Sequence, residues 1–159
     1  MNQPFYHINS SGFTLLEMML VLVVAALLAA VAVPNMQPAM ASMQLRSATQ
    51  DVASALRHTR GQALSRGREA EFALNVKKHF YRVAGRHKPY VLPESVKLEL
   101  FTADMLMDAD EGQGRIVFYP DGSASGGRVT LSGAGRVWVV DVNWLTGGVA
   151  VREDDDGKP

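Results

Sequence analysis

Glu17 is the one ionisable side chain in a long apolar run, which makes it the first candidate for chemistry. The run extends from Phe13 to Val33 and stops at Pro34. A charged side chain in such a segment costs about 2.5–3.5 kcal/mol near the centre of a bilayer and less near its end. We therefore interpret Glu17 as functional. The alternative is a plain signal peptide or anchor that tolerates one acid.

The apolar run is long enough to cross a membrane. As a helix, residues 13–33 would rise about 32 Å, against about 30 Å for a bilayer core. A polar stretch, residues 1–12, precedes the run. An ordinary secretory signal has a basic start, an apolar core of about 7–15 residues and a small-residue cleavage site. This run is too long for that pattern and leads into no such site, so we predict a transmembrane helix at 13–33.

Few other residues have a spacing that suggests chemistry. The chain has no cysteine, which excludes disulfides, thiolate nucleophiles and cysteine-based metal sites. Residues 108–112 faintly resemble a calcium loop, but Gln113 and Tyr119 stand where an EF-hand needs glycine and glutamate. Four histidines stand singly and are interpreted as solvated: His7, His58, His79 and His87. We therefore expect no catalytic residue, no metal and no cofactor.

Residues 34–66 are predicted to continue the helix in amphipathic form. Pro34 and Pro38 interrupt the backbone hydrogen-bond ladder, so we predict a helix kink at Pro34. Beyond the prolines, apolar residues recur about every three or four positions and polar residues fill the rest. The apolar set is Met40, Met43, Ala48, Val52, Ala55, Leu56, Ala63 and Leu64. This face needs a partner, and the helix should end near residues 65–67.

From residue 69 the pattern changes to short β-branched or aromatic runs separated by turn residues. The runs are Ala70–Val76, Phe80–Ala84, Val96–Phe101, Arg115–Tyr119, Arg128–Leu131, Arg136–Val142 and Gly148–Val151. We predict an α+β fold, in which the long N-terminal helix packs on an antiparallel sheet or two small sheets of a β domain at 67–152. Residues 102–113 are predicted to be a mobile surface loop, and residues 153–159 a disordered acidic tail.

The charges balance in total but not along the chain. Sixteen basic residues match sixteen acidic ones; residues 46–97 carry eleven basic and four acidic side chains, and residues 99–159 carry five and eleven. We interpret most of this split as solvated faces, with a contact surface as the alternative. Binding of nucleic acid is not favoured, because the acidic C-terminal stretch 152–156 would repel phosphates.

The stretch Gly12-Phe13-Thr14-Leu15-Leu16-Glu17 resembles the processing site of type IV pilins and of the pseudopilins of type II secretion. The resemblance implies that residues 1–12 are a prepilin leader peptide, that a prepilin peptidase cuts between Gly12 and Phe13, and that the new Phe13 amine is methylated. It also implies that Glu17 pairs with the Phe13 amine of a neighbouring subunit during assembly. Two opposite charges at about 4 Å attract by roughly 4 kcal/mol at an effective dielectric near 20. A pair within one chain is the alternative.

Three further stretches resemble the branch of pilin-like proteins that contains the minor pseudopilin H (GspH) and the minor pilin FimT. They are residues 57–68, residues 116–129, with the turn Pro120-Asp121-Gly122, and residues 144–148. The resemblance implies a pilin-like fold and assembly without catalysis, at or near the tip of a periplasmic pseudopilus that exports folded proteins.

The same resemblance implies a location and a set of partners. The chain would cross the bacterial inner membrane once, with a cytoplasmic N-terminus and a periplasmic domain. The implied partners are the prepilin peptidase, the major pseudopilin, other minor pseudopilins and the inner-membrane assembly platform. The alternative is a FimT-like minor pilin that binds DNA for uptake by a type IV pilus.

Overall fold

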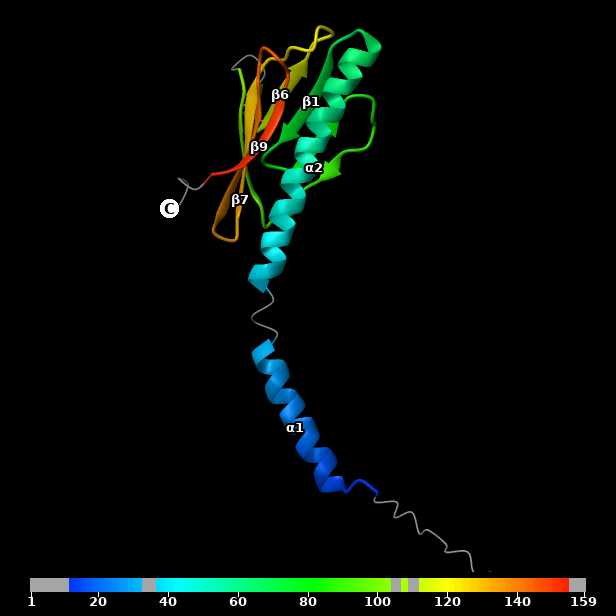
Figure 1. Ribbon diagram of the computed structural model, residues 1–159, viewed down its shortest axis with the longest axis vertical. Helices are drawn as coiled ribbons and strands as arrows, with labels where there is room; N and C mark the ends of the chain where they lie inside the picture. Colours follow the sequence, from blue (N-terminus) through cyan, green and yellow to red (C-terminus); the bar gives the residue numbers. More distant parts are fainter. Residues whose placement is uncertain (1–11, 33–36, 104–106, 109–111, 155–159) are drawn as a thin grey trace, which may run out of the picture. The chain divides into compact units, whose positions relative to one another are not determined.

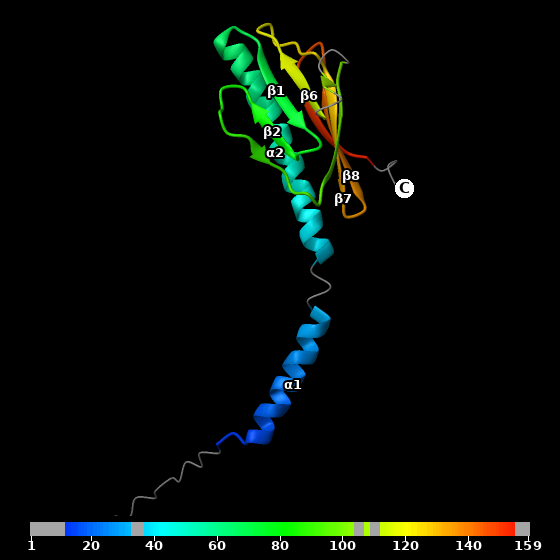
Figure 2. The same ribbon diagram turned by 180° about the vertical axis from the view of Figure 1, so that it is seen from behind.

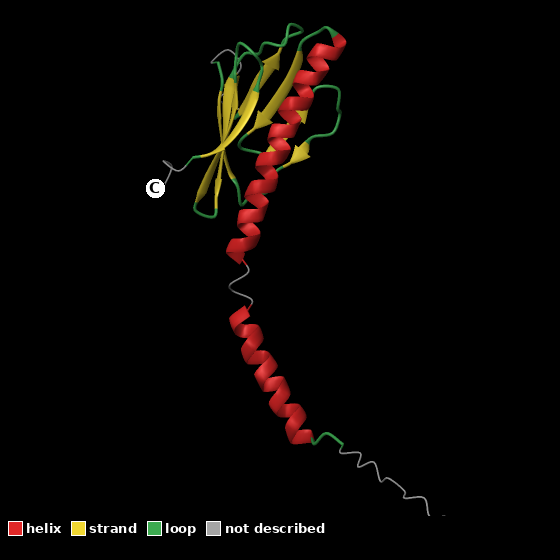
Figure 3. Cartoon of the chain, viewed as in Figure 1, coloured by secondary structure: helices red, strands yellow, loops and turns green. Residues whose placement is uncertain are grey.

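The chain divides into two units, Met1–Gln37 and Pro38–Pro159, each with its own secondary structure. The computed structural model describes residues 12–32, 37–103, 107–108 and 112–154. The leader up to residue 11, the kink predicted at Pro34 and the last five residues of the tail lie outside the described residues. Figures 1 and 3 show the helices and strands of the two units.

The first unit contains helix α1, Leu15–Ala32, whose 18 residues are all apolar except Glu17. The helix begins two residues later than the apolar run because Thr14 caps it. The Glu17 amide donates a hydrogen bond to Thr14 Oγ1 at 3.2 Å, and the Met18 amide donates to the Thr14 carbonyl, also at 3.2 Å. Within the described ranges, no helix is both long and apolar enough to span a membrane.

The second unit is built on helix α2, Gln37–Arg66, all of which except its first residue belongs to this unit. Pro38 is its second residue, a position where a helix tolerates proline because the missing N–H would have no partner within the helix. The buried face carries Leu45, Ala48, Val52, Ala53, Ala55, Leu56 and Ala63. Two threonines on this face satisfy their hydroxyls within the helix: Thr49 donates to the Leu45 carbonyl at 2.9 Å, and Thr59 to the Ala55 carbonyl at 2.8 Å.

Three residues of the predicted apolar face are exposed instead. Met40, Met43 and Leu64 are 58%, 73% and 46% exposed. Since each residue turns a helix by about 100°, Met43 lies about 200° away from Leu45, on the opposite side of α2. The prediction missed Leu45 and included residues that follow the spacing only approximately.

Two antiparallel sheets pack with α2 around one core. The first has the order β3-β2-β1-β6-β5 and the second β4-β7-β8-β9. The first sheet contains β1 Ala70–Asn75, β2 Phe80–Val83, β3 Tyr90–Val91, β5 Met107–Asp108 and β6 Gln113–Phe118. The second contains β4 Lys97–Phe101, β7 Gly127–Gly133, β8 Arg136–Val142 and β9 Val149–Glu153. The core joins residues of α2 with residues of both sheets. Figure 2 shows α2 and the strands from the back. The predicted α+β class and the alternative of two small sheets are confirmed.

The structure differs from the prediction in two short segments. Residues 102–113 are not simply a surface loop: Thr102 is buried, β5 lies within the segment, and β6 starts at Gln113. Glu153, assigned to the disordered tail, is the last residue of β9, and the Asp154 amide donates to the Val137 carbonyl at 2.9 Å. At Glu153 and Asp154, backbone pairing with β8 outweighs the acidic composition that predicted disorder.

Candidate functional site

The predicted processing site lies in exposed, non-helical chain directly before α1. Residues 12–14 have no regular secondary structure, and Phe13 is 74% exposed. A Cβ built on Gly12 would meet no atom within 4 Å. The Gly12–Phe13 peptide bond is therefore accessible in an irregular segment, the form in which a protease can bind a substrate backbone.

Glu17 is the third residue of α1, and its side chain is exposed. Phe13 and Glu17 are four residues apart but do not share a helix face, because the helix begins at Leu15. The four-residue spacing places two side chains on one face only where both residues are helical. Thr14 is the residue that sequence reasoning missed. The available signal was the spacing Thr-x-x-Glu before an apolar run, which is typical of a helix capping box.

We expect Thr14→Ala to loosen the first turn of α1. Loss of an N-cap hydroxyl costs about 1 kcal/mol, so the Glu17 and Met18 amides should exchange hydrogen about fivefold faster. Hydrogen exchange of the chain in detergent micelles, followed by mass spectrometry, measures this rate. Thr14→Ser keeps the hydroxyl and is the matched control. Equal exchange in the Ala and Ser variants would remove Thr14 from the cap.

The structure brings together the three further stretches that the sequence singled out, residues 57–68, 116–129 and 144–148. Gly147 has a φ of +59°, and a Cβ built on it would lie 2.3 Å from the Gly122 carbonyl oxygen and 3.0 Å from Arg60 Nε. The helix end, the 120–122 turn and the 143–148 loop thus meet at Gly147. Arg57 Nη2 also donates to the Val149 carbonyl at 3.3 Å, which ties α2 to the start of β9.

The 143–148 loop is ordered by its first residue. Asn143 Oδ1 accepts hydrogen bonds from the Leu145 amide at 3.0 Å, the Thr146 amide at 3.0 Å and the Thr146 hydroxyl at 3.2 Å. The Gly147 amide donates to the Asn143 carbonyl at 2.8 Å. These bonds leave Trp144 and Leu145 exposed at the tip of the loop, at 66% and 63%.

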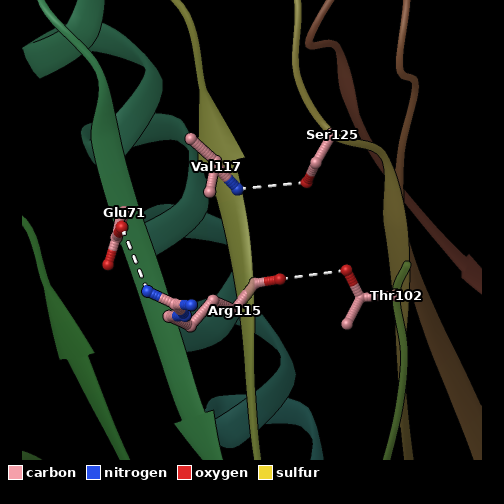
Figure 4. A network of polar contacts seen from close by, with 5 residues as sticks. All are labelled: Glu71, Thr102, Arg115, Val117 and Ser125. Carbon is pink, nitrogen blue, oxygen red and sulfur yellow. Dashed lines mark hydrogen bonds and ion pairs between the residues drawn. The ribbon is translucent and has the colours of Figure 1, made fainter. Parts of the chain in front are cut away.

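Hydrogen bonds around β6 join the two sheets (Figure 4). Thr102, just after β4, donates its hydroxyl to the Arg115 carbonyl of β6 at 2.9 Å. Ser125, just before β7, accepts a hydrogen bond from the Val117 amide through its Oγ at 3.1 Å. The Ser125 amide in turn donates to the Val117 carbonyl at 2.8 Å. The ion pair of Arg115 with Glu71 at 3.4 Å is exposed, and such pairs contribute about 0–1 kcal/mol. The 116–129 stretch is therefore a structural link between the sheets.

A cluster of three charged side chains lies on the sheet β4-β7-β8-β9. Asp141 Oδ1 accepts from Arg128 Nε at 2.6 Å, and its Oδ2 accepts from Arg152 Nε at 3.1 Å. Burial alone would raise the pKa of the Asp141 carboxyl, but the hydrogen bonds and charges of the two arginines hold this pKa below its ordinary value. In the part of the chain that the structure describes, no three His, Asp or Glu side chains are grouped closely enough to hold a metal ion.

Comparisons with known proteins cover both ends of the chain. Residues 48–147 match the family "Type II transport protein GspH", and residues 8–33 match the prokaryotic N-terminal methylation motif. The chain is 35% identical over 138 residues to the type II secretion system protein H of Xanthomonas campestris pv. campestris, covering 87% of this chain and 80% of that protein. The methylation motif implies processing by a prepilin peptidase and indicates a membrane-anchored periplasmic protein.

Solved structures of pilin-like proteins share the fold. The type IV minor pilin FimU of Pseudomonas aeruginosa superposes with a TM-score of 0.54 at 9% identity, over 72% of this chain and 95% of that one. The minor pseudopilin EpsH of the type 2 secretion system of Vibrio cholerae superposes with a TM-score of 0.51 at 11% identity, over 72% and 98%. At such identities the likeness concerns the fold alone. From the family match and the identity to protein H, the chain belongs to the GspH family of minor pseudopilins of type II secretion.

Proposed function

We propose that this chain is cut between Gly12 and Phe13, methylated on the Phe13 amine and assembled at or near the tip of a periplasmic pseudopilus. The leader, residues 1–12, would stay cytoplasmic, residues 13–33 would cross the inner membrane once, and the β domain would lie in the periplasm. The observation that carries the proposal is the exposed, non-helical Gly12–Phe13 bond, directly before a capped apolar helix.

Glu17 would set the register of the subunit in the pseudopilus. Its carboxylate is exposed on α1, the apolar helix of the described chain, so an oppositely charged partner can reach it. The partner would be the Phe13 amine of a neighbouring subunit, which exists only after cleavage. Pairing would neutralise the acid as the helix leaves the bilayer, where an unpaired charge is costly.

The β domain would serve recognition rather than catalysis. Other minor pseudopilins, the major pseudopilin and the inner-membrane assembly platform would be its partners, and export of folded proteins across the outer membrane would be the outcome. Exposed Trp144 and Leu145, on a loop held by Asn143, support a contact role for this end of the domain.

Deleting the gene tests the proposal. We expect exoproteins to accumulate in the periplasm, while DNA uptake and twitching motility stay normal, and the full-length chain supplied in trans should restore secretion. The reverse pattern, with normal secretion and lost DNA uptake, would instead support a role as a minor pilin of a type IV pilus.

A further inference from the structure

Two exposed aromatic side chains line one groove of the β domain. Phe101, the last residue of β4, and Trp144, in the 143–148 loop, are 77% and 66% exposed. Both border a groove of about 820 Å³ that Gly126 and Gly127 also line, and we call this the aromatic groove. Large aromatic side chains exposed together are typical of interaction sites, because they offer apolar area that water solvates poorly.

The backbone that carries the aromatic residues of the groove is held in place by contacts within the domain. The Trp144 carbonyl accepts from the Ala124 amide at 2.9 Å, and a Cβ built on Gly126 would lie 3.2 Å from the Trp144 Cβ. Phe101 precedes Thr102, which is bonded to Arg115 of β6. A rigid surface loses little conformational entropy on binding, so more of the contact energy is available for affinity.

One carboxylate of the aromatic groove is available to a basic partner. Asp141 and Arg128 line the groove and pair with each other, and Asp141 also pairs with Arg152. Glu99, which also lines the groove, is exposed and forms no ion pair with any residue that the structure describes. Among the charged side chains that line the groove, Glu99 is thus the one without an ion pair in the described chain.

The groove also borders a sheet edge. β4 is the first strand of its sheet, with β7 as its neighbour, and Glu99 and Phe101 lie two residues apart, on the same face of the strand. An extended segment can add to such an edge through its backbone, with alternate side chains directed to one face. A segment bound there would meet Phe101 and Glu99 with side chains spaced two residues apart.

We propose that the aromatic groove binds an extended segment of another pseudopilin subunit. The segment places an apolar side chain between Phe101 and Trp144 and a lysine or arginine against Glu99. This inference rests on the proposed function, since it takes the partner from the same pseudopilus.

Site-specific photo-crosslinking in secreting cells tests the inference. The full-length chain, in the deletion strain, carries p-benzoylphenylalanine in place of Phe101, Trp144 or, as the control, Val91, which is 80% exposed on β3. Antibodies against each pseudopilin identify the adducts. We expect positions 101 and 144 to give an adduct with the same pseudopilin and position 91 to give at least about tenfold less.

A charge reversal supplies the second arm. Glu99→Lys should lower the adduct from position 144 by about tenfold, whereas Lys97→Glu, on the same strand face but outside the groove, should leave it unchanged. Equal adducts from position 91, adducts only with this same chain or with an exoprotein, or no effect of Glu99→Lys would each overturn the inference. If the variants restore secretion but give no pseudopilin adduct, the inference is wrong while the proposed function stands. If deletion of the gene leaves secretion intact, the proposed function itself is wrong.

Discussion

A Glu17→Ala chain should be cleaved and methylated normally and then fail to enter the pseudopilus. Cleavage depends on the exposed Gly12–Phe13 bond, which Glu17 does not cover in the described chain. Assembly would lose a charge pair that attracts by up to about 4 kcal/mol at 4 Å and an effective dielectric near 20. Removing the acid should also favour retention in the bilayer, where a charge costs about 2.5–3.5 kcal/mol near the centre.

Two substitutions separate charge from size at this position. Glu17→Gln keeps the shape without the charge and should fail like Glu17→Ala, whereas Glu17→Asp keeps the charge and should retain part of the incorporation. The measurement is the fraction of the chain in sheared or immunoprecipitated pseudopili, relative to the processed chain in the membrane. Normal incorporation of Glu17→Gln would show that the carboxylate charge has no part in assembly.

Gly147→Ala should destabilise the β domain by about 3–5 kcal/mol, a large part of the 5–15 kcal/mol that stabilises a typical domain. A non-glycine residue at a φ of +59° costs about 1–2 kcal/mol by itself. The added Cβ would also lie 2.3 Å from the Gly122 carbonyl oxygen, a backbone atom that moves only if the 120–122 turn moves. Urea unfolding of the 43–159 fragment, which retains the whole core, measures the loss.

Gly135→Ala is the matched control for Gly147→Ala. Gly135 has a φ of +72°, and a Cβ built on it would meet no atom within 4 Å. This variant should lose only the conformational part, about 1–2 kcal/mol. If the two variants unfold at the same urea concentration, the contact of Gly147 with Gly122 is not what fixes the loop.

The sequence predicted well those features that depend on local pattern. The runs that became β1, β2, β4, β6, β7, β8 and β9 alternate or are β-branched over four or more residues, and turn residues separate them. β3 and β5 are two residues long, too short to show a periodicity. They form because their backbones pair with neighbouring strands, β3 with β2 at Phe80 and β5 with β6 at Gly114. The exposed Met40 and Met43 show that an approximate spacing does not identify which side of a helix meets the sheet.

The candidate site likewise combines residues that a local motif identifies with contacts that depend on tertiary packing. Gly12, Phe13 and Glu17 are contiguous enough for a sequence motif to identify them, and the cap by Thr14 was present in the same motif. The meeting of Arg60, Gly122 and Gly147 could not be predicted, because it joins positions far apart in the chain through tertiary packing. The aromatic groove likewise combines a strand end with a distant loop, so only the folded domain brings Phe101 and Trp144 to one surface.

The mass of the N-terminal peptide, from chain purified out of cells with and without the prepilin peptidase, tests the central claim most directly. With the peptidase, the peptide should begin at Phe13 and carry one added methyl group on its amine. Without the peptidase, or in a Gly12→Ala chain, the leader of residues 1–12 should remain. A chain that retains its leader in cells with an active peptidase, or that is cut at another bond, would contradict the account.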